Sequence, residues 1–191
     1  ALMIETARGC PYQCAFCFVG LDEYKDLAKF SLDRVKADLS YIAERMHGFQ
    51  SSLLCICDSN FGMYQRDEEI AFHIRTLQDK YDWPMAFSVT TGKAQHDRIL
   101  RVAETLQNKM LVSGSVQSLN RETSKLIKRR NLPIPKYTAL LSEIKKRKMF
   151  SGVELIIPMP GESKETFLNG VETILDAEAG SVLPYTTMLL P

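Results

Sequence analysis

The sequence predicts an α/β fold, in the form of a partial parallel barrel of six strand–helix units. Six short runs rich in Val, Ile and Leu recur along the 191 residues, and helical patterns lie between them. The runs do not alternate strictly between apolar and polar residues, which is typical of buried parallel strands. Strand–helix alternation gives a parallel sheet with right-handed crossovers, and six units are too few for a closed eight-unit barrel. The expected strands are residues 2–6, 52–57, 85–89, 110–116, 153–157 and 182–186.

Each predicted helix has apolar residues spaced by three and four, and some have recognisable ends. Ser31 can cap the first helix, and Gly48 stands where a C′ glycine would end it. Asp97 lies in the first turn of the third helix, and the sixth begins near Ser163. The defining apolar positions are Leu32, Val35, Leu39, Ile42 and Met46; Ile70, Ile74, Leu77 and Tyr81; Ile99, Ala103 and Leu106; Leu126 and Ile127; Leu140, Leu141 and Ile144; and Phe167, Val171, Ile174 and Leu175.

Three cysteines, Cys10, Cys14 and Cys17, follow the first predicted strand at a C-x3-C-x2-C spacing. Soft thiolates on one loop select an iron–sulfur cluster, zinc or copper. A [4Fe–4S] cluster normally takes four cysteines, so three would leave one iron free to bind a small molecule. A structural zinc site is the alternative, and its fourth ligand would have to be Cys55, Cys57 or a histidine. The loop lies beyond the carboxyl end of a strand, where such sheets bind ligands.

Composition excludes several other classes of protein. The formal net charge of +1 gives no basic excess for nucleic acid, and no apolar run approaches the roughly 20 residues that span a bilayer. Five cysteines, an odd number with three clustered, favour a reducing compartment, and we expect a cytoplasmic protein. Ala1 precedes the first strand without a leader, and Pro191 follows an apolar run. We therefore expect a segment of a longer polypeptide.

Residues 5–17, ETARGCPYQCAFC, resemble the cluster loop of the radical S-adenosylmethionine (SAM) superfamily, including the aromatic residue before the last cysteine. Residues 115–119, SVQSL, and 155–163, LIIPMPGES, resemble the motifs of that superfamily's fourth and fifth strands. The resemblance covers nearly the whole chain and implies a partial (β/α)6 barrel of the radical SAM type. It is closest to the branch with a cobalamin-binding domain ahead of the radical domain. That domain is expected before residue 1, and a C-terminal extension after residue 191.

The resemblance also implies a chemistry. The open iron would chelate the amino and carboxylate groups of SAM, and an electron from the cluster would cleave the C5′–S bond to give a 5′-deoxyadenosyl radical. We expect a cobalamin-dependent methyltransferase, with a small-molecule or natural-product substrate and an external electron donor of the flavodoxin or ferredoxin type. The alternatives are a cobalamin-independent radical enzyme, of the methylthiotransferase or RNA-modifying type, and a non-catalytic zinc-stabilised binding module.

Several residues are expected to contact SAM on the side of the first three strands. Phe16, in the cluster loop, is expected to wall the adenine or to anchor the loop. The family's glycine-rich turn after the second strand is replaced here by residues 58–62, DSNFG. Asp58 or Asn60 can accept hydrogen bonds from the ammonium of SAM, or can form a simple Asx turn. Thr90, after the third strand, suits a ribose or a carboxylate, with solvated loop polarity as the alternative.

Other candidates follow the fourth and fifth strands. In related enzymes a glutamine matching Gln117 bonds the ribose hydroxyls, and a basic residue matching Arg129 clamps the carboxylate, with Arg130 as a possible substitute. The alternative is a solvated basic helix end. Glu154 is expected to reach ribose oxygens, or else to face helices or solvent. Ile156 is expected to pack on adenine, or else to be ordinary core.

The remaining cysteines and the histidines are given ordinary roles. Cys55 and Cys57 share one face of the second strand, and we expect them to pack in the core. His47, His73 and His96 have no common spacing and are expected at the surface or at helix ends.

Overall fold

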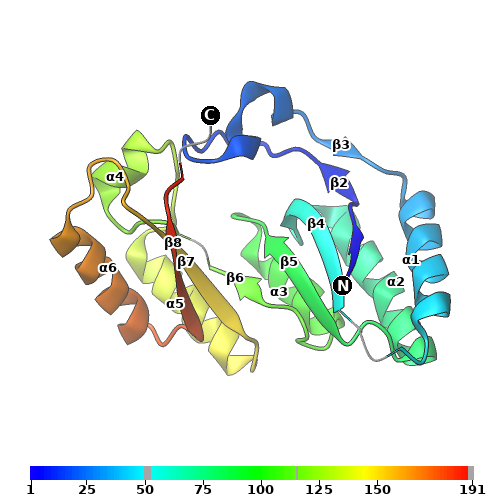
Figure 1. Cartoon of the computed structure of the whole chain (residues 1–191). Helices are drawn as coiled ribbons and strands as arrows, with labels where there is room; N and C mark the ends of the chain where they lie inside the picture. Colours follow the sequence, from blue (N-terminus) through cyan, green and yellow to red (C-terminus); the bar gives the residue numbers. More distant parts are fainter. Residues whose placement is uncertain (50–52, 115, 189–191) are drawn as a thin grey trace. The chain divides into compact units, whose positions relative to one another are not determined.

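The computed structural model describes residues 1–49, 53–114 and 116–188 (Figure 1). The chain forms two compact units: the first unit is Ala1–Gly9 with Leu27–Val112, and the second unit is Cys10–Asp26 with Ser113–Pro191. The strands are β1 (Leu2–Ile4), β2 (Ala7–Arg8), β3 (Ala28–Lys29), β4 (Leu53–Phe61), β5 (Ala86–Thr91), β6 (Val112–Ser113), β7 (Ser151–Ile157) and β8 (Ser181–Thr186). The α-helices are α1 (Leu32–Met46), α2 (Gln65–Tyr81), α3 (His96–Thr105), α4 (Arg121–Leu126), α5 (Ile134–Lys146) and α6 (Lys164–Asp176), and two 3-10 helices are η1 (Phe18–Gly20) and η2 (Asp22–Tyr24).

The first unit contains a parallel sheet in the order β1-β4-β5. Figure 1 shows α1, α2 and α3 side by side along this sheet, and neighbouring helices contact each other. Burial alternates along β4: Leu54 and Ile56 are buried, whereas Cys55 is half-buried and Cys57 is exposed. The prediction that both cysteines pack in the core is therefore wrong for Cys57. The period of two was correct, but the face that carries the cysteines is the one the first unit leaves uncovered.

The second unit contains a sheet in the order β6-β7-β8. Strands β7 and β8 are parallel and pair from Gly152↔Ser181 to Ile157↔Thr186. Helix α5 contacts β7, and α6 contacts β8. The α/β fold class with parallel strands is confirmed. The side chains that form the core of this unit are Val116, Tyr137, Leu141, Ile144, Val153, Leu155 and Ile174.

The predicted helix ends are confirmed where the sequence named them. The Ser31 hydroxyl accepts a hydrogen bond from Arg34 N at the start of α1. Gly48 follows the end of α1 with φ +85°, as expected of a C′ glycine. Ser163 caps α6 by accepting from Thr166 N. These caps were predictable because a cap needs only residues adjacent in sequence.

One strand prediction is corrected, and one strand pair was not predicted. The expected strand over residues 110–116 is reduced to β6, with isolated bridges at Met110 and Gln117. Gln117 has φ +66°, in the left-handed region, so the chain is not extended there. The antiparallel pair β2–β3 was not expected at all, because strands of two residues carry no periodic signal. This pair brackets the cysteine loop in the chain.

Parts of some predictions fall outside the described residues. They are the start of the second expected strand at Ser52, Ser115 in the fourth-strand motif, and the C-terminal run 189–191. Of the histidines, His47 and His96 lie at helix ends as expected, but His73 is half-buried within α2 and lies 2.9 Å from Ser40 Oγ. None of the helices in the described ranges is long and apolar enough to cross a membrane.

Candidate cofactor-binding site

The cysteine loop is held by its own backbone and by the end of α4, all within the second unit. Cys10 and Cys14 are buried and Cys17 is half-buried. Cys17 N donates to Cys14 O at 3.0 Å, and Ala15 N donates to Ile127 O at 3.0 Å. The Ile127 contact fixes the middle of the loop to a residue more than a hundred positions away. The sulfur atoms are thus held on a structured loop.

Gly20 is a residue of this loop that sequence reasoning missed. A Cβ at Gly20 would lie 2.5 Å from Cys14 O, closer than real Cβ contacts occur. Gly20 N also donates to Cys17 O at 2.9 Å. Any side chain here would push against the backbone that carries Cys14. The available signal was a glycine three residues after the last cysteine. Phe16, from the same loop, is half-buried.

Arg129 is a charged residue close to the thiol of Cys14. It is only 6% exposed, and its Nη1 lies 4.0 Å from Cys14 Sγ. Burial lowers the pKa of the Arg129 guanidinium from its usual range, while Cys14 and Glu154 act in the opposite direction. Arg130, the suggested substitute, is exposed. The alternative of a solvated basic helix end therefore describes Arg130 and does not describe Arg129.

Gln117 lies beside β7 in a strained conformation. Its N–H donates to Glu154 O at 3.0 Å, and its carbonyl accepts from Ile156 N at 2.9 Å. The side chain is buried, and Gln117 Oε1 has no hydrogen-bond partner in the part of the chain that the structure describes. Glu154 and Ile156 are half-buried on the same face of β7. A buried acceptor without a partner is uncommon and often marks a place for a ligand or water.

Asn131 is a second residue that the sequence analysis missed. Its side-chain Oδ1 accepts from Arg129 Nε at 3.0 Å, and its Nδ2 donates to the carbonyls of Val116 and Ser118. Within the second unit the structure thus brings together Cys14, Arg129, Glu154 and Gln117. The sequence carried no signal for Asn131, because its partners include backbone carbonyls 13 and 15 positions earlier.

The candidates of the first unit have different surroundings. Asp58 is buried, and its carboxylate accepts from Thr6 N at 2.6 Å and from the Thr6 hydroxyl. Burial raises the pKa of the Asp58 carboxyl, and the hydrogen bonds from Thr6 oppose this shift. Asn60 is buried, whereas Thr90 is exposed at the end of β5. The Asp58 carboxylate therefore already binds the chain that leads into β2.

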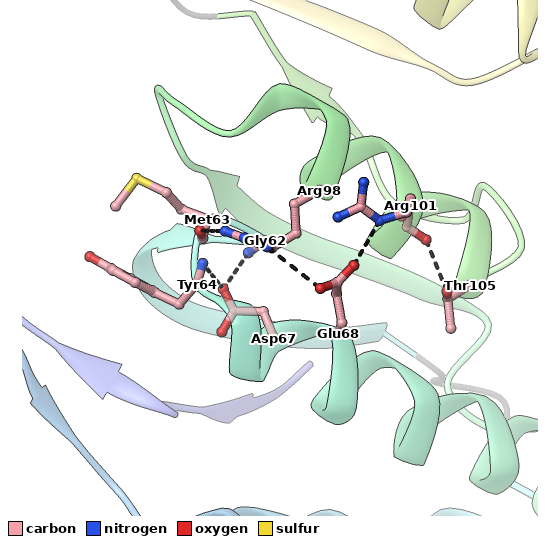
Figure 2. Close-up of polar contacts among 8 residues, drawn as sticks. All are labelled: Gly62, Met63, Tyr64, Asp67, Glu68, Arg98, Arg101 and Thr105. Atoms are coloured by element: carbon pink, nitrogen blue, oxygen red, sulfur yellow. Dashed lines mark hydrogen bonds and ion pairs between the residues drawn. The ribbon is translucent and has the colours of Figure 1, made fainter.

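The turn after β4 is fixed to the start of α2. Gly62 N and Tyr64 N both donate to Asp67 Oδ2, at 2.8 and 3.0 Å, as Figure 2 shows. Asp67 is 1% exposed, and burial raises its pKa to about 6 against the opposing pull of these hydrogen bonds. Gly62 has φ +85°, a conformation that favours glycine. The turn follows directly from Asn60.

The same turn is also tied to α3. Arg98 Nη1 donates to Met63 O at 2.6 Å. The Arg98 guanidinium also lies 3.5 Å from Glu68, and Arg101 Nε lies 2.8 Å from the same carboxylate (Figure 2). Two helices therefore hold a single three-residue turn through side chains that the sequence analysis did not select.

A family model described as the radical SAM superfamily matches residues 4–174. The chain belongs to the radical SAM superfamily. The resemblance that the motifs indicated is therefore confirmed. Membership implies a [4Fe–4S] cluster and S-adenosylmethionine as cofactors.

Two curated relatives of this radical SAM chain are methyltransferases. One is the 2-(S-pantetheinyl)-carbapenam-3-carboxylate methyltransferase of Streptantibioticus cattleyicolor, and it is 31% identical over 176 residues, 91% of this chain and 25% of that protein. The other is the cobalamin-dependent radical SAM methyltransferase TokK of Streptomyces tokunonensis, with the same identity and coverage. The chain thus spans about a quarter of the length of the curated relatives it matches.

Solved structures show the same radical SAM fold. The methyltransferase TsrM from Kitasatospora setae, with cobalamin and a [4Fe–4S] cluster bound, matches with a TM-score of 0.76 at 16% identity, over 97% of this chain and 34% of that one. Coproporphyrinogen III oxidase (HemN) from Escherichia coli matches with a TM-score of 0.71 at 16% identity, over 100% of this chain and 44% of that one. At this identity the matches establish the fold alone.

The residues present fit a radical SAM cluster. Among residues 1–49, 53–114 and 116–188, no three or more His, Cys, Asp or Glu side chains are arranged to hold one metal ion. A closed structural zinc site needs four such ligands at a single point, whereas a cluster takes its cysteines on separate iron atoms. Cys10, Cys14 and Cys17 supply three thiols on one loop, which fits the donor set of such a cluster, and Arg129 supplies a positive charge beside Cys14.

Proposed function

We propose that this chain is the radical SAM core of a cobalamin-dependent methyltransferase. The observation that carries the finer assignment is the 31% identity to TokK along 91% of the chain. The cysteine loop and the buried Arg129 beside Cys14 support the broader assignment, which is that the chain binds a [4Fe–4S] cluster and SAM.

Each residue of the second unit has a proposed role in holding the cofactors. Cys10, Cys14 and Cys17 would ligate three irons of the cluster. Arg129 would bind the SAM carboxylate, since a guanidinium matches a carboxylate with two parallel N–H donors. Gln117 would use its unsatisfied Oε1 to accept from a ribose hydroxyl.

Glu154 and Ile156 share one face of β7, which suits a nucleoside with a polar sugar and an apolar base. Glu154 would accept from ribose hydroxyls, and Ile156 would pack against adenine. Phe16 would cover the adenine from the cysteine loop. When bound, the cluster would supply one electron for reductive cleavage of the C5′–S bond of SAM, which gives methionine and the 5′-deoxyadenosyl radical.

In the first unit we propose that Asn60 contacts the SAM ammonium, and that Thr90 contacts the ribose or carboxylate. For Asp58 we propose a structural role and not a direct contact with the ligand. Its oxygens accept from Thr6, so it holds the end of β1 in place ahead of the cysteine loop. The Asp58 carboxylate is thus bound to the protein itself, and the contact with the SAM ammonium is assigned to Asn60.

The proposal extends to the rest of the protein. A cobalamin-binding domain would precede residue 1 and an extension would follow residue 191, and the relatives, of which the matched region is 25%, have room for both. The substrate would be a small molecule or natural product, and an external flavodoxin- or ferredoxin-type protein would deliver electrons. Cysteines must stay reduced to bind iron, which favours the cytoplasm.

Anaerobic reconstitution of the full-length protein with iron and sulfide tests the proposal. We expect a cluster absorption spectrum, formation of 5′-deoxyadenosine on addition of a reductant, and methyl transfer that requires cobalamin. Radical formation and turnover without cobalamin would reject the methyltransferase and retain a cobalamin-independent radical enzyme. A colourless zinc protein that does not cleave SAM would reject both.

A further inference from the structure

Asn131 uses both ends of its amide to join two parts of the second unit. On one side its Oδ1 accepts from Arg129 Nε at 3.0 Å. On the other side its Nδ2 donates to Val116 O and Ser118 O, each at 2.8 Å. An asparagine amide offers two N–H donors and one acceptor oxygen, and these contacts engage all of them. Nδ2 also lies 3.4 Å from Ser124 Oγ.

The two carbonyls that Asn131 binds are those of the residues on either side of Gln117. Gln117 has φ +66°, which a non-glycine residue adopts only when its surroundings enforce it. A single amide that binds both flanking carbonyls is such a constraint. The Gln117 side chain is consequently held with its Oε1 buried.

The hydrogen bond that Arg129 donates to Asn131 constrains the orientation of the guanidinium. A guanidinium binds a carboxylate well only when its plane is fixed, because the donors form a rigid fork. The Asn131 oxygen engages Nε, at the base of that fork, while Nη1 is directed to Cys14 Sγ. The orientation of the guanidinium and the bend at Gln117 are therefore set by one residue.

We propose that Asn131 is a positioning residue for SAM, which couples the carboxylate contact of Arg129 to the ribose contact of Gln117. The inference rests on the proposed function of this site. Asn131 acts through its two neighbours and does not itself touch the ligand. Its loss should weaken SAM binding while leaving the cluster ligands intact.

Equilibrium binding of SAM to the full-length, reconstituted protein tests the coupling. We compare the natural protein with Asn131→Ala, Arg129→Ala and the double variant. Each single change should weaken binding roughly tenfold, the effect of losing one charge-assisted hydrogen bond. The double variant should bind more weakly than Arg129→Ala alone, because the Gln117 contact is also disturbed, but by less than the product of the two single penalties, because contacting residues in one network are not additive.

Decarboxylated SAM gives a readout that a merely structural role would not change. Removal of the ligand carboxylate should weaken binding to the natural protein, have little effect on Arg129→Ala, and have a reduced effect on Asn131→Ala. If Asn131→Ala weakens both ligands equally, the link to Arg129 is rejected.

Asn120→Ala is the matched control in the same unit. Asn120 is also a half-buried asparagine, but its Oδ1 accepts from Glu122 N and Thr123 N to cap α4. We expect this variant to lose stability and to keep the preference for the carboxylate. If Asn131→Ala fails to fold, Asn131→Asp replaces it, since a carboxylate keeps the acceptor for Arg129 and removes the two donors. It should keep the carboxylate preference and bind both ligands more weakly.

The outcomes separate this inference from the proposed function. If the natural protein forms no cluster or binds no SAM, the proposed function is rejected and the inference with it. If the natural protein binds SAM and Asn131→Ala binds it equally well, only the inference is rejected. Multiplying penalties in the double variant would likewise reject it.

Discussion

The turn after β4 in the first unit and the bend at Gln117 in the second unit are both candidate cofactor contacts, but their polar groups are treated differently. In the turn, Gly62 and Tyr64 donate to the buried Asp67, and Met63 accepts from Arg98. At the bend, the buried Gln117 Oε1 has no partner among the described residues.

Arg98 and Arg129, one from each unit, differ in the same way. Arg98 reaches a backbone carbonyl and the Glu68 carboxylate, so the protein itself supplies its acceptors. Arg129 is 6% exposed, and it contacts the amide oxygen of Asn131, 3.0 Å from its Nε, and the thiol of Cys14. Burying a charge is costly unless it is compensated, and a thiol compensates less than a carboxylate does. The comparison supports the proposal that the Arg129 region receives an anionic ligand, whereas Arg98 serves to hold the turn after β4 in place.

The largest effect is expected from Cys14→Ala, which removes a proposed cluster ligand in the second unit. We expect loss of the cluster and of all 5′-deoxyadenosine formation, measured by iron content and product analysis after anaerobic reconstitution. Cys57→Ala is the matched control, because Cys57 is an exposed thiol on β4. A Cys14→Ala protein that keeps four irons would refute the assignment.

Arg129→Ala should weaken SAM binding by about tenfold or more, since a charged hydrogen bond contributes about 1.5–3 kcal/mol. The iron content should not change. The neighbouring Arg130→Ala is the control, because Arg130 is exposed and should leave the affinity as it is. Equal effects of the two substitutions, in an equilibrium binding measurement, would remove the distinction between scaffold and ligand-binding charges.

Asp67→Asn should change how stability depends on pH. The folded-state pKa of Asp67 is raised from 3.8 to about 6, so this group favours folding most below about pH 4, and the benefit is lost as pH rises through 6. The shift corresponds to about 3 kcal/mol. The difference in free energy of unfolding, natural protein minus Asp67→Asn, should fall by about that amount between pH 4 and 7.

Urea unfolding of the full-length protein at several pH values measures this difference. Asp79→Asn is the control on the same helix, because Asp79 is exposed and pairs with Arg75. An equal pH dependence in both variants would show that burial of Asp67 is not the cause.

The smallest effect is expected from Arg98→Ala, which removes the hydrogen bond to Met63 O. We expect a loss of about 1 kcal/mol in the free energy of unfolding. Arg101→Ala, which removes an exposed ion pair to the same Glu68, should cost less than about 0.5 kcal/mol. A larger loss for Arg101 would mean that the ion pairs, and not the bond to the turn, hold α3 to this region.

Much of the difference between the turn after β4 and the bend at Gln117 could not be predicted from the sequence. The Asp58 carboxylate follows a strand and could be predicted as a ligand contact, but its partner Thr6 lies 52 residues away. Gly20 and Asn131 fit no local pattern, because what makes them necessary is an atom of another segment. Cys57 illustrates the same limit: periodicity assigned its face correctly, and only the packing of the helices decided which face was covered.

The sequence by itself determined the cysteine spacing, the order of the longer strands and helices, and the helix caps. These depend on residues a few positions apart, and the chemistry of three adjacent thiols does not change with the fold. The tertiary structure alone decided that Arg129, and not Arg130, lies buried beside Cys14, a residue 115 positions away. It also decided that Gln117 bends into the left-handed region. Burial and backbone strain are set by contacts between distant segments, and no local pattern encodes them.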